Sequence, residues 1–136
     1  MKIVMVSGHF DPLHDIHLEY FRQAMNWGAF LLVVVASDGQ VIAKKGKVNI
    51  PEAKRLWIAD LVLKGLGIKH QTIINHLDRD GTVTDSLRWW RPDVFFRGND
   101  KSPDKFPEQE AKACEDCGIR VVYARFAGER HSSEMM

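Results

Sequence analysis

The stretch IVMVSGHFDPLHDIH, residues 3–17, joins a run of apolar residues to a polar segment with two histidines three positions apart. The apolar run predicts a buried strand, and the polar segment predicts the start of a helix. A helix N-terminus offers unpaired N–H groups and a partial positive charge, and side chains at i and i+3 lie on one helix face. His14 and His17 can therefore reach the same anion, and the stretch predicts a phosphate site.

Length and composition limit the class of protein. The chain has 136 residues, which fits one domain over residues 1–136, and its 19 basic and 18 acidic residues give a net charge of +1. No overall field favours nucleic acid or a membrane as partner. The N-terminus does not resemble a signal peptide, and no apolar run approaches about 18 residues, so we expect a cytoplasmic protein. Cys114 and Cys117 form a single C-x-x-C pair, which favours structural thiols over a metal site.

Strand and helix patterns alternate along the whole chain. Apolar runs predict strands at 2–7, 29–37, 71–74, 93–96 and 119–123. Helical patterns follow in between, beginning near Asp15, Pro51, Thr82 and Pro107. Residues 39–50 are polar and read as a mobile basic loop. This order predicts an α/β fold with one doubly wound parallel sheet, whose ligands bind beyond the carboxyl ends of the strands.

Residues 8–17 resemble the G-x-F-D-x-x-H-x-G-H signature of the cytidylyltransferase-like nucleotidyltransferase superfamily. Supporting segments follow in the order that superfamily implies: Ser37-Asp38, the lysines at 44 and 45, Pro51 to Arg55, Arg97 to Asp100, and Ser132-Ser133. The resemblance covers essentially the whole chain and implies a small Rossmann-like sheet. The spacings look most like glycerol-3-phosphate cytidylyltransferases and heptose-phosphate adenylyltransferases. One position departs from the signature, because Ile16 stands where the superfamily has glycine.

The resemblance implies transfer of a nucleoside monophosphate from a triphosphate, CTP before ATP, to a small phosphorylated alcohol or sugar, with release of pyrophosphate. His14 and His17 would contact the α-phosphate, and Lys45 would follow the departing pyrophosphate. Mg²⁺ would arrive with the triphosphate, and relatives of this kind are commonly homodimers. The implied nucleotide contacts lie at Gly8, His9, Phe10, Asp11, Lys44, Arg55, Arg97, Gly98, Asn99, Asp100, Ser132 and Ser133.

The sequence leaves several alternative interpretations open. The lysines also fit an ordinary solvated loop, residues 97–100 a plain turn, and residues 128–133 a frayed tail. The tryptophans at 57, 89 and 90 fit a core or a dimer surface better than a base-stacking platform. Ile16 predicts an altered nucleotide pose or reduced activity, so the alternative function is a nucleotide-binding protein with little or no turnover. Hydrolysis of a nucleotide conjugate is weaker, because no general base is evident.

Overall fold

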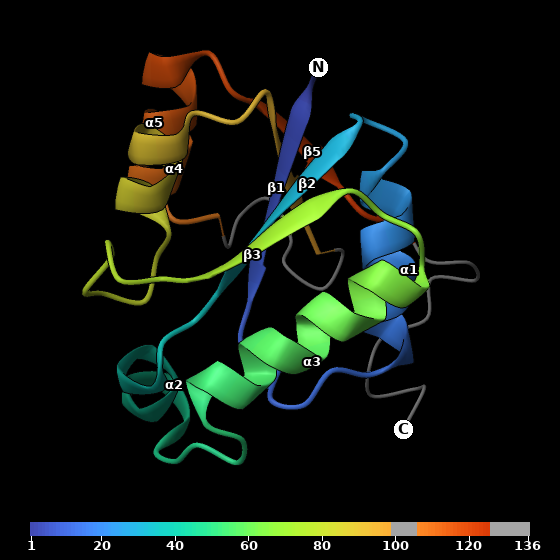
Figure 1. Ribbon diagram of the computed structural model, residues 1–136. Helices are drawn as coiled ribbons and strands as arrows, with labels where there is room; N and C mark the ends of the chain where they lie inside the picture. Colours follow the sequence, from blue (N-terminus) through green and yellow to red (C-terminus); the bar gives the residue numbers. More distant parts are fainter. Residues whose placement is uncertain (99–105, 126–136) are drawn as a thin grey trace.

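The computed structural model describes residues 1–98 and 106–125, and in them the predicted strands and helices occur in the predicted order, with one additional helix between the second and third strands (Figure 1). The strands are β1 (Ile3–Gly8), β2 (Phe30–Val35), β3 (His70–Ile74), β4 (Val94–Arg97) and β5 (Arg120–Tyr123). The helices are α1 (Asp15–Ala24), α2 (Asp38–Lys45), α3 (Glu52–Gly65), α4 (Thr84–Trp90) and α5 (Glu108–Cys117).

The five strands form one parallel sheet in the order β3-β2-β1-β4-β5. The order reverses at β1, so that β2 and β3 extend to one side and β4 and β5 to the other. This is the Rossmann-like, doubly wound α/β arrangement, and the predicted fold class is confirmed. In such a sheet the crevice for a ligand lies at the carboxyl end of the strand where the order reverses. That strand is β1, which leads directly into the histidine segment.

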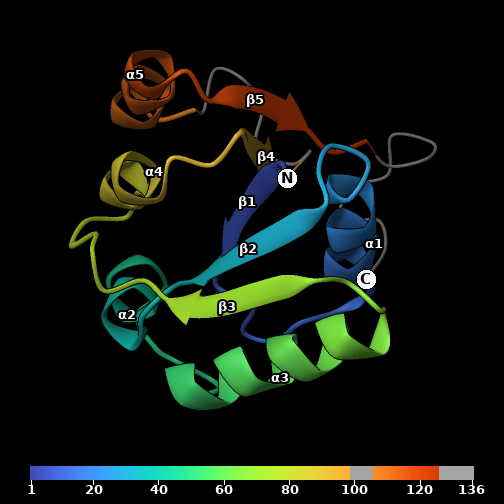
Figure 2. The same ribbon diagram turned by 45° about the horizontal axis from the view of Figure 1, so that its top comes forward.

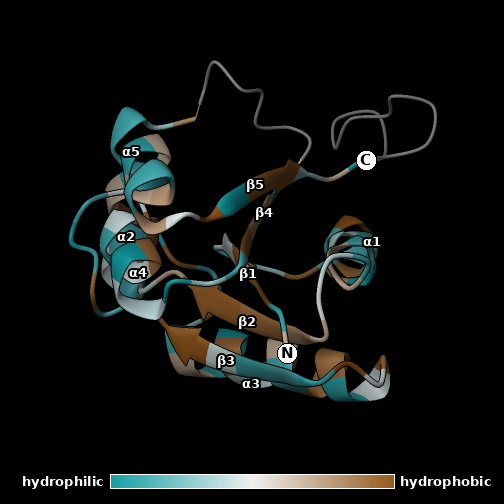
Figure 3. Cartoon of the chain, turned by 90° about the horizontal axis from the view of Figure 1, so that it is seen from above, coloured by the Kyte–Doolittle hydropathy of each residue, from teal (hydrophilic) through white to brown (hydrophobic). Residues whose placement is uncertain are grey.

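Side chains along the strands alternate between two cores, one on each face of the sheet. Val4 and Val6 of β1 belong to the core that packs against α1 and α3, whereas Met5 belongs to the core that packs against α4 and α5. Figure 2 shows α1 and α3 on one side of the sheet and α4 and α5 on the other. The strands are largely hydrophobic in Figure 3, as expected for a sheet covered on both faces.

One element differs from the sequence prediction. Residues 39–50 were expected to form a mobile basic loop, but residues 38–45 form the helix α2. The Ser37 side chain accepts a hydrogen bond from the Gln40 backbone N–H, and the Gln40 side chain accepts one from the Ser37 N–H. Gly46 ends the helix in the left-handed conformation, with φ of 83°. This S-x-x-Q capping box and the glycine stop outweigh the polar composition.

Candidate nucleotide site at the carboxyl end of β1

The segment that leaves β1 is held by a phenylalanine turned into the core. Phe10 has φ of 52°, a left-handed conformation that is uncommon for a bulky residue, and only 3% of its surface is exposed. A Cβ atom on Gly8 would lie 2.9 Å from the Phe10 ring, so glycine is needed for this packing. The same ring meets His17 edge-on, with centroids 5.1 Å apart. The packing of Phe10 against Gly8 therefore places its ring where it contacts and positions His17.

His14 and His17 cap the N-terminus of α1 reciprocally. The Nδ1 atom of His14 accepts a hydrogen bond from the Ile16 backbone N–H at 3.3 Å. The Nδ1 atom of His17 accepts one from the His14 backbone N–H at 3.2 Å. The two imidazole rings stack, with centroids 3.9 Å apart. His14 thus occupies the N-cap position, which is usually Ser or Thr in a capping box, and His17 occupies the N3 position, which is usually Glu or Gln.

This arrangement sets the tautomer of each ring. A backbone N–H can only donate, so each Nδ1 must present a lone pair, and the ring proton of the neutral imidazole resides on Nε2. Both histidines are therefore prepared to donate an Nε2–H hydrogen bond without first taking up a proton. The His14 side chain is 43% exposed, which leaves it open to a ligand. The prediction that both rings serve one anion fits this geometry.

Asp11 has a different role from the one its position in the motif suggests. Its carboxylate accepts hydrogen bonds from the backbone N–H groups of Asn49 and Ile50, at 2.8 and 2.7 Å. Burial acts to raise the pKa of Asp11, but these two bonds and the charges of Arg55 and Lys45 outweigh it and hold the pKa below its ordinary value. Both carboxylate oxygens are thus engaged in fastening the segment before α3 to the histidine segment.

Arg55 is the most deeply buried charge of the site, and its side chain has no exposed surface. Its guanidinium donates to three backbone carbonyls, those of His9, Ala36 and Ile50, at 2.7, 2.8 and 2.7 Å. It also forms an ion pair with Asp38 at 2.9 Å. The sequence interpretation predicted that this arginine contacts the nucleotide. In the structure the Arg55 side chain is buried beneath the site, where it joins the carboxyl ends of β1 and β2 to α2 and α3.

The two lysines expected in a loop lie in the last turn of α2, and both are exposed. Their charges complement the negative end of the helix dipole. Lys45 lies near enough to Asp11 for its charge to act on that carboxylate. Within the described part of the chain, neither Lys44 nor Lys45 forms an ion pair. Of the two, Lys45 is the lysine whose charge reaches the histidine segment.

Arg97 ends β4, and only 5% of its surface is exposed. Its guanidinium lies 4.2 Å from the centre of the Phe106 ring and donates to the Tyr123 hydroxyl at 3.2 Å. Gly98 is partly buried and follows it at the carboxyl end of the strand. The structure thus brings this end of β4 beside that of β1. The four remaining predicted residues, Asn99, Asp100, Ser132 and Ser133, lie outside the described residues.

Sequence reasoning missed a buried polar cluster at the end of β3. The Asp78 carboxylate accepts hydrogen bonds from the backbone N–H groups of Asp85 and Ser86, at 2.6 and 3.1 Å, and from the Ser86 hydroxyl at 2.7 Å. Asn75 donates to the same carboxylate at 3.1 Å. Asp78 therefore binds the N-terminus of α4 from seven residues away. The sequence signal was the pair Asn75 and Asp78 just before a turn, which is typical of local capping.

The described residues contain neither a cluster of metal ligands nor a helix that could span a membrane. Across residues 1–98 and 106–125, no three His, Cys, Asp or Glu side chains gather as metal ligands would. Cys114 is buried in α5, and burial raises the pKa of its thiol to about 11, which leaves it unreactive. Cys117, at the end of that helix, is partly buried. Among the described helices, none is both long and apolar enough to cross a membrane.

The comparisons with known proteins agree with this geometry. The sequence model of the cytidylyltransferase-like family matches residues 5–126. An FAD synthase from Picrophilus torridus is 31% identical over 137 residues, covering 98% of this chain and 91% of the relative. A D-beta-D-heptose 1-phosphate adenylyltransferase from Bordetella bronchiseptica is 28% identical, covering 98% and 79%. The crystal structure of a lipopolysaccharide core biosynthesis protein from Thermoplasma volcanium superimposes with a TM-score of 0.68 at 29% identity, covering 93% and 97% of the two chains.

Proposed function

Because this chain belongs to the cytidylyltransferase-like family and is a nucleotidyltransferase, we propose that it transfers AMP from ATP to a small phosphorylated acceptor and releases pyrophosphate. A nucleoside triphosphate as substrate follows from its relatives. The sequence interpretation placed CTP before ATP. The names of the two relatives favour the opposite order, since one is an adenylyltransferase and the other makes an adenine dinucleotide.

In the proposed reaction an oxygen of the acceptor's phosphate attacks the α-phosphorus of ATP. The new P–O bond forms as the bond from the α-phosphorus to the bridging oxygen breaks, and the bonding electrons leave with pyrophosphate. Charge grows on the α-phosphate oxygens and on the leaving group, so the protein's task is positioning and electrostatic stabilisation. The Nε2–H groups of His14 and His17 would donate to the α-phosphate, and Lys45 would accompany the pyrophosphate, with Lys44 beside it.

The reciprocal cap of His14 and His17 is the observation that carries this proposal. It holds two neutral donors side by side at the positive end of a helix, at the carboxyl edge where the strand order reverses. Mg²⁺ bound to the triphosphate would neutralise part of its charge. Because no carboxylate cluster gathers among the described residues, we propose that the ion is held mainly by the phosphates and water.

A second candidate function rests on Ile16. This residue lies in the first turn of α1, between the two histidines, and its side chain is partly exposed. A branched side chain there narrows the space beside the helix N-terminus. The candidate is a protein that binds the nucleotide with little or no turnover.

Pyrophosphate release separates the two functions. The protein is incubated with each of the four nucleoside triphosphates and with FMN, heptose 1-phosphate or glycerol 3-phosphate as acceptor. Release that needs both ATP and one acceptor supports the proposal. A thermal shift with ATP but no release with any pair supports the second candidate. Release with CTP alone would restore the order of nucleotides predicted from the sequence.

A further inference from the structure

His70 is a nearly buried histidine at the first position of β3, and each nitrogen of its ring lies against a hydrogen-bond acceptor. The side chain is 7% exposed. The Nδ1 atom lies 2.6 Å from the carbonyl oxygen of Ile68, and the Nε2 atom lies 2.7 Å from the Oδ1 atom of Asp60 in α3. Both distances are those of hydrogen bonds, so each ring nitrogen has a partner.

The two partners determine how many protons the ring carries. A backbone carbonyl only accepts hydrogen bonds, so Nδ1 carries a proton. Asp60 is ionised, because the hydrogen bonds from His70 and then Lys64 lower the pKa of its carboxyl and outweigh burial, which acts to raise it. An ionised carboxylate also only accepts, so Nε2 carries a proton as well. A ring with protons on both nitrogens is an imidazolium cation.

The charged groups around this ring come from α3 and from the preceding residue of the chain. The Asp60 carboxylate gives its Oδ1 atom to His70 and its Oδ2 atom to Lys64, whose Nζ atom lies 3.1 Å away. Lys64 and Lys69 are exposed, so solvent screens their repulsion of the ring. On the side of β2, His70 pairs with the apolar residue Leu31. The attraction of Asp60 is therefore the dominant charge interaction of the imidazolium.

We propose that His70 is a buried cation that links the last turns of α3 to the start of β3, and that the link breaks when the ring gives a proton to water. A neutral imidazole has one N–H, so one of the two hydrogen bonds is lost and a lone pair faces an oxygen of Ile68 or Asp60. The inference is independent of the proposed reaction.

The link gives α3 a buried cation at each end. Arg55 lies in the first turn of the helix and its side chain has no exposed surface, whereas His70 lies where the chain returns from the helix to the sheet (Figure 1). An arginine stays charged at every pH at which proteins fold, and a histidine does not. The attachment at the start of α3 is therefore permanent, and the attachment at its end depends on pH.

The pH dependence follows from which state of the chain holds the proton more tightly. In an unfolded chain a histidine titrates near pH 6.5, and the two acceptors make the folded chain hold its proton more tightly than that. The contribution of the link to stability is therefore fully present below about pH 6.5 and declines as the pH rises until the folded chain also releases the proton. At the acid end it is lost as the pH falls through the pKa of Asp60, which is lowered from 3.8.

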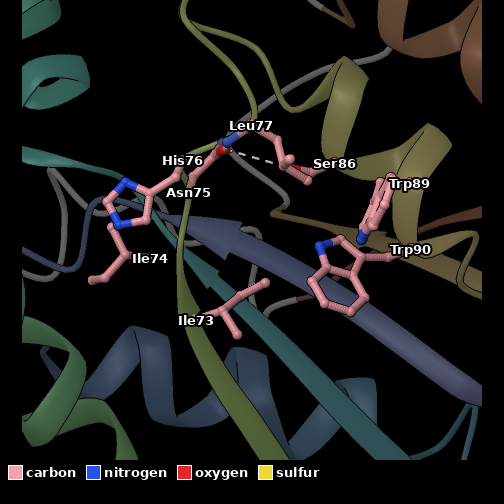
Figure 4. A pocket seen from close by; sticks show the side chains of 8 residues that line it. All are labelled: Ile73, Ile74, Asn75, His76, Leu77, Ser86, Trp89 and Trp90. Atoms are coloured by element: carbon pink, nitrogen blue, oxygen red, sulfur yellow. Dashed lines mark hydrogen bonds between the residues drawn. The ribbon is translucent and has the colours of Figure 1, made fainter.

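The number of ring protons is measured by NMR on the full chain labelled with ¹⁵N at histidine and assigned through the backbone. At about pH 7.5, where an ordinary histidine is mostly neutral, the ring ¹⁵N shifts of His70 should be those of two N–H groups. His76 is the matched control, because it follows the same strand and its exposed ring lines the pocket shown in Figure 4; it should show one N–H. One bare ring nitrogen at His70 at this pH would overturn the proposal.

Asp60→Asn tests the partner. The amide keeps the shape of the side chain but removes its charge, so the His70 ring should release its proton at a lower pH than in the wild type. Lys64→Met is the control, because it breaks only the exposed ion pair at the same carboxylate and should leave the His70 proton in place. The same release of the proton in both variants, or in neither, would contradict a link through Asp60.

Urea unfolding between about pH 6 and about pH 8.5 is the second readout. The wild type should be more stable than Asp60→Asn at the acid end of this range, and the difference should shrink as the pH rises. The difference between the wild type and Lys64→Met should change little over the same range. A wild-type advantage over Asp60→Asn that does not depend on pH would show that His70 gives up no proton on this account, and the proposal would fail.

Discussion

Replacing the histidines by residues that keep the cap but remove the Nε2 donor separates their two roles. Asn at position 14 still offers a side-chain oxygen to the Ile16 N–H, and Gln at position 17 still offers one to the backbone N–H of residue 14. Each amide also carries an N–H donor, but that donor is on a rotatable side chain instead of a rigid ring, so it is not held in the fixed direction of the imidazole Nε2–H. His14→Asn and His17→Gln should therefore fold as the wild type does and lose activity.

The expected loss of stability is much smaller than the expected loss of activity. The Ile16 N–H bond to His14 is 3.3 Å long and solvent-exposed, so His14→Ala should cost about 0.5–1 kcal/mol of stability, or about 2–5 °C in Tm. His14→Asn should cost less than half of that. Loss of one donor to a developing charge lowers kcat about 10²–10³-fold, which corresponds to about 3–4 kcal/mol. His14→Asn and His17→Gln should each show this loss.

The assay is steady-state pyrophosphate release with ATP and the acceptor found for the wild type, alongside thermal unfolding of each variant. His76→Ala is the matched control, because His76 is exposed just after the carboxyl end of β3, an outer strand of the sheet, and has no proposed contact with the nucleotide. If His14→Asn and His17→Gln retain wild-type kcat, then the Nε2 donors do not act on the α-phosphate. If they lose activity only in proportion to a lowered Tm, the histidines serve the helix alone.

Three further predictions concern the frame of the site. Arg55→Met should cost about 3–5 kcal/mol in urea unfolding, since it removes the cation that pairs with Asp38 and the donor to three buried carbonyls. Arg88→Met, at an exposed ion pair, should cost less than about 1 kcal/mol; equal losses would contradict this. The folded pKa of Asp11 is lowered, so its contribution is present above its ordinary pKa and lost as pH falls through the folded value. Asp11→Asn should thus unfold more easily than wild type at pH 7, with the gap closing below about pH 4; a gap that does not depend on pH would refute the assignment. Ile16→Gly should strengthen the thermal shift given by ATP, and if both affinity and turnover stay unchanged, the side chain does not narrow the site.

The fold was predictable because each element of the sheet carries a local signal. Unbroken apolar runs predicted strands buried on both faces, and a glycine or proline separated most of them from the helices. The helix α2 was missed although its signals were present, since Ser37 and Gln40 have capping-box spacing and Gly46 is a helix stop. The density of charged residues in this segment predicts a loop, and the hydrogen bonds at the two ends of the helix outweigh it.

The candidate site was predictable only in part. The spacing of His14 and His17 predicts one shared face, which depends on local helix geometry alone. The burial of Arg55 depends on the carbonyls of His9 and Ala36, which lie 46 and 19 residues away and approach it only when the sheet has formed. No local pattern distinguishes such an arginine from one that faces a ligand. The tautomers of the histidines likewise follow from hydrogen bonds that a sequence does not display.

The buried arginine also determines which charges can serve the substrate. The hydrogen bonds of Arg55 go to backbone carbonyls and to Asp38. The buried guanidinium therefore does not reach the substrate, and it affects the site through the groups that it positions. One of those groups is the N-terminus of α2, the helix that carries Lys45 in its last turn. We therefore expect a shift of Arg55 to move this helix, and with it the lysine, relative to the histidines. It follows that Arg55→Lys should weaken turnover more than ATP binding, because the departing pyrophosphate depends on that alignment while the nucleotide can still reach the cap of α1.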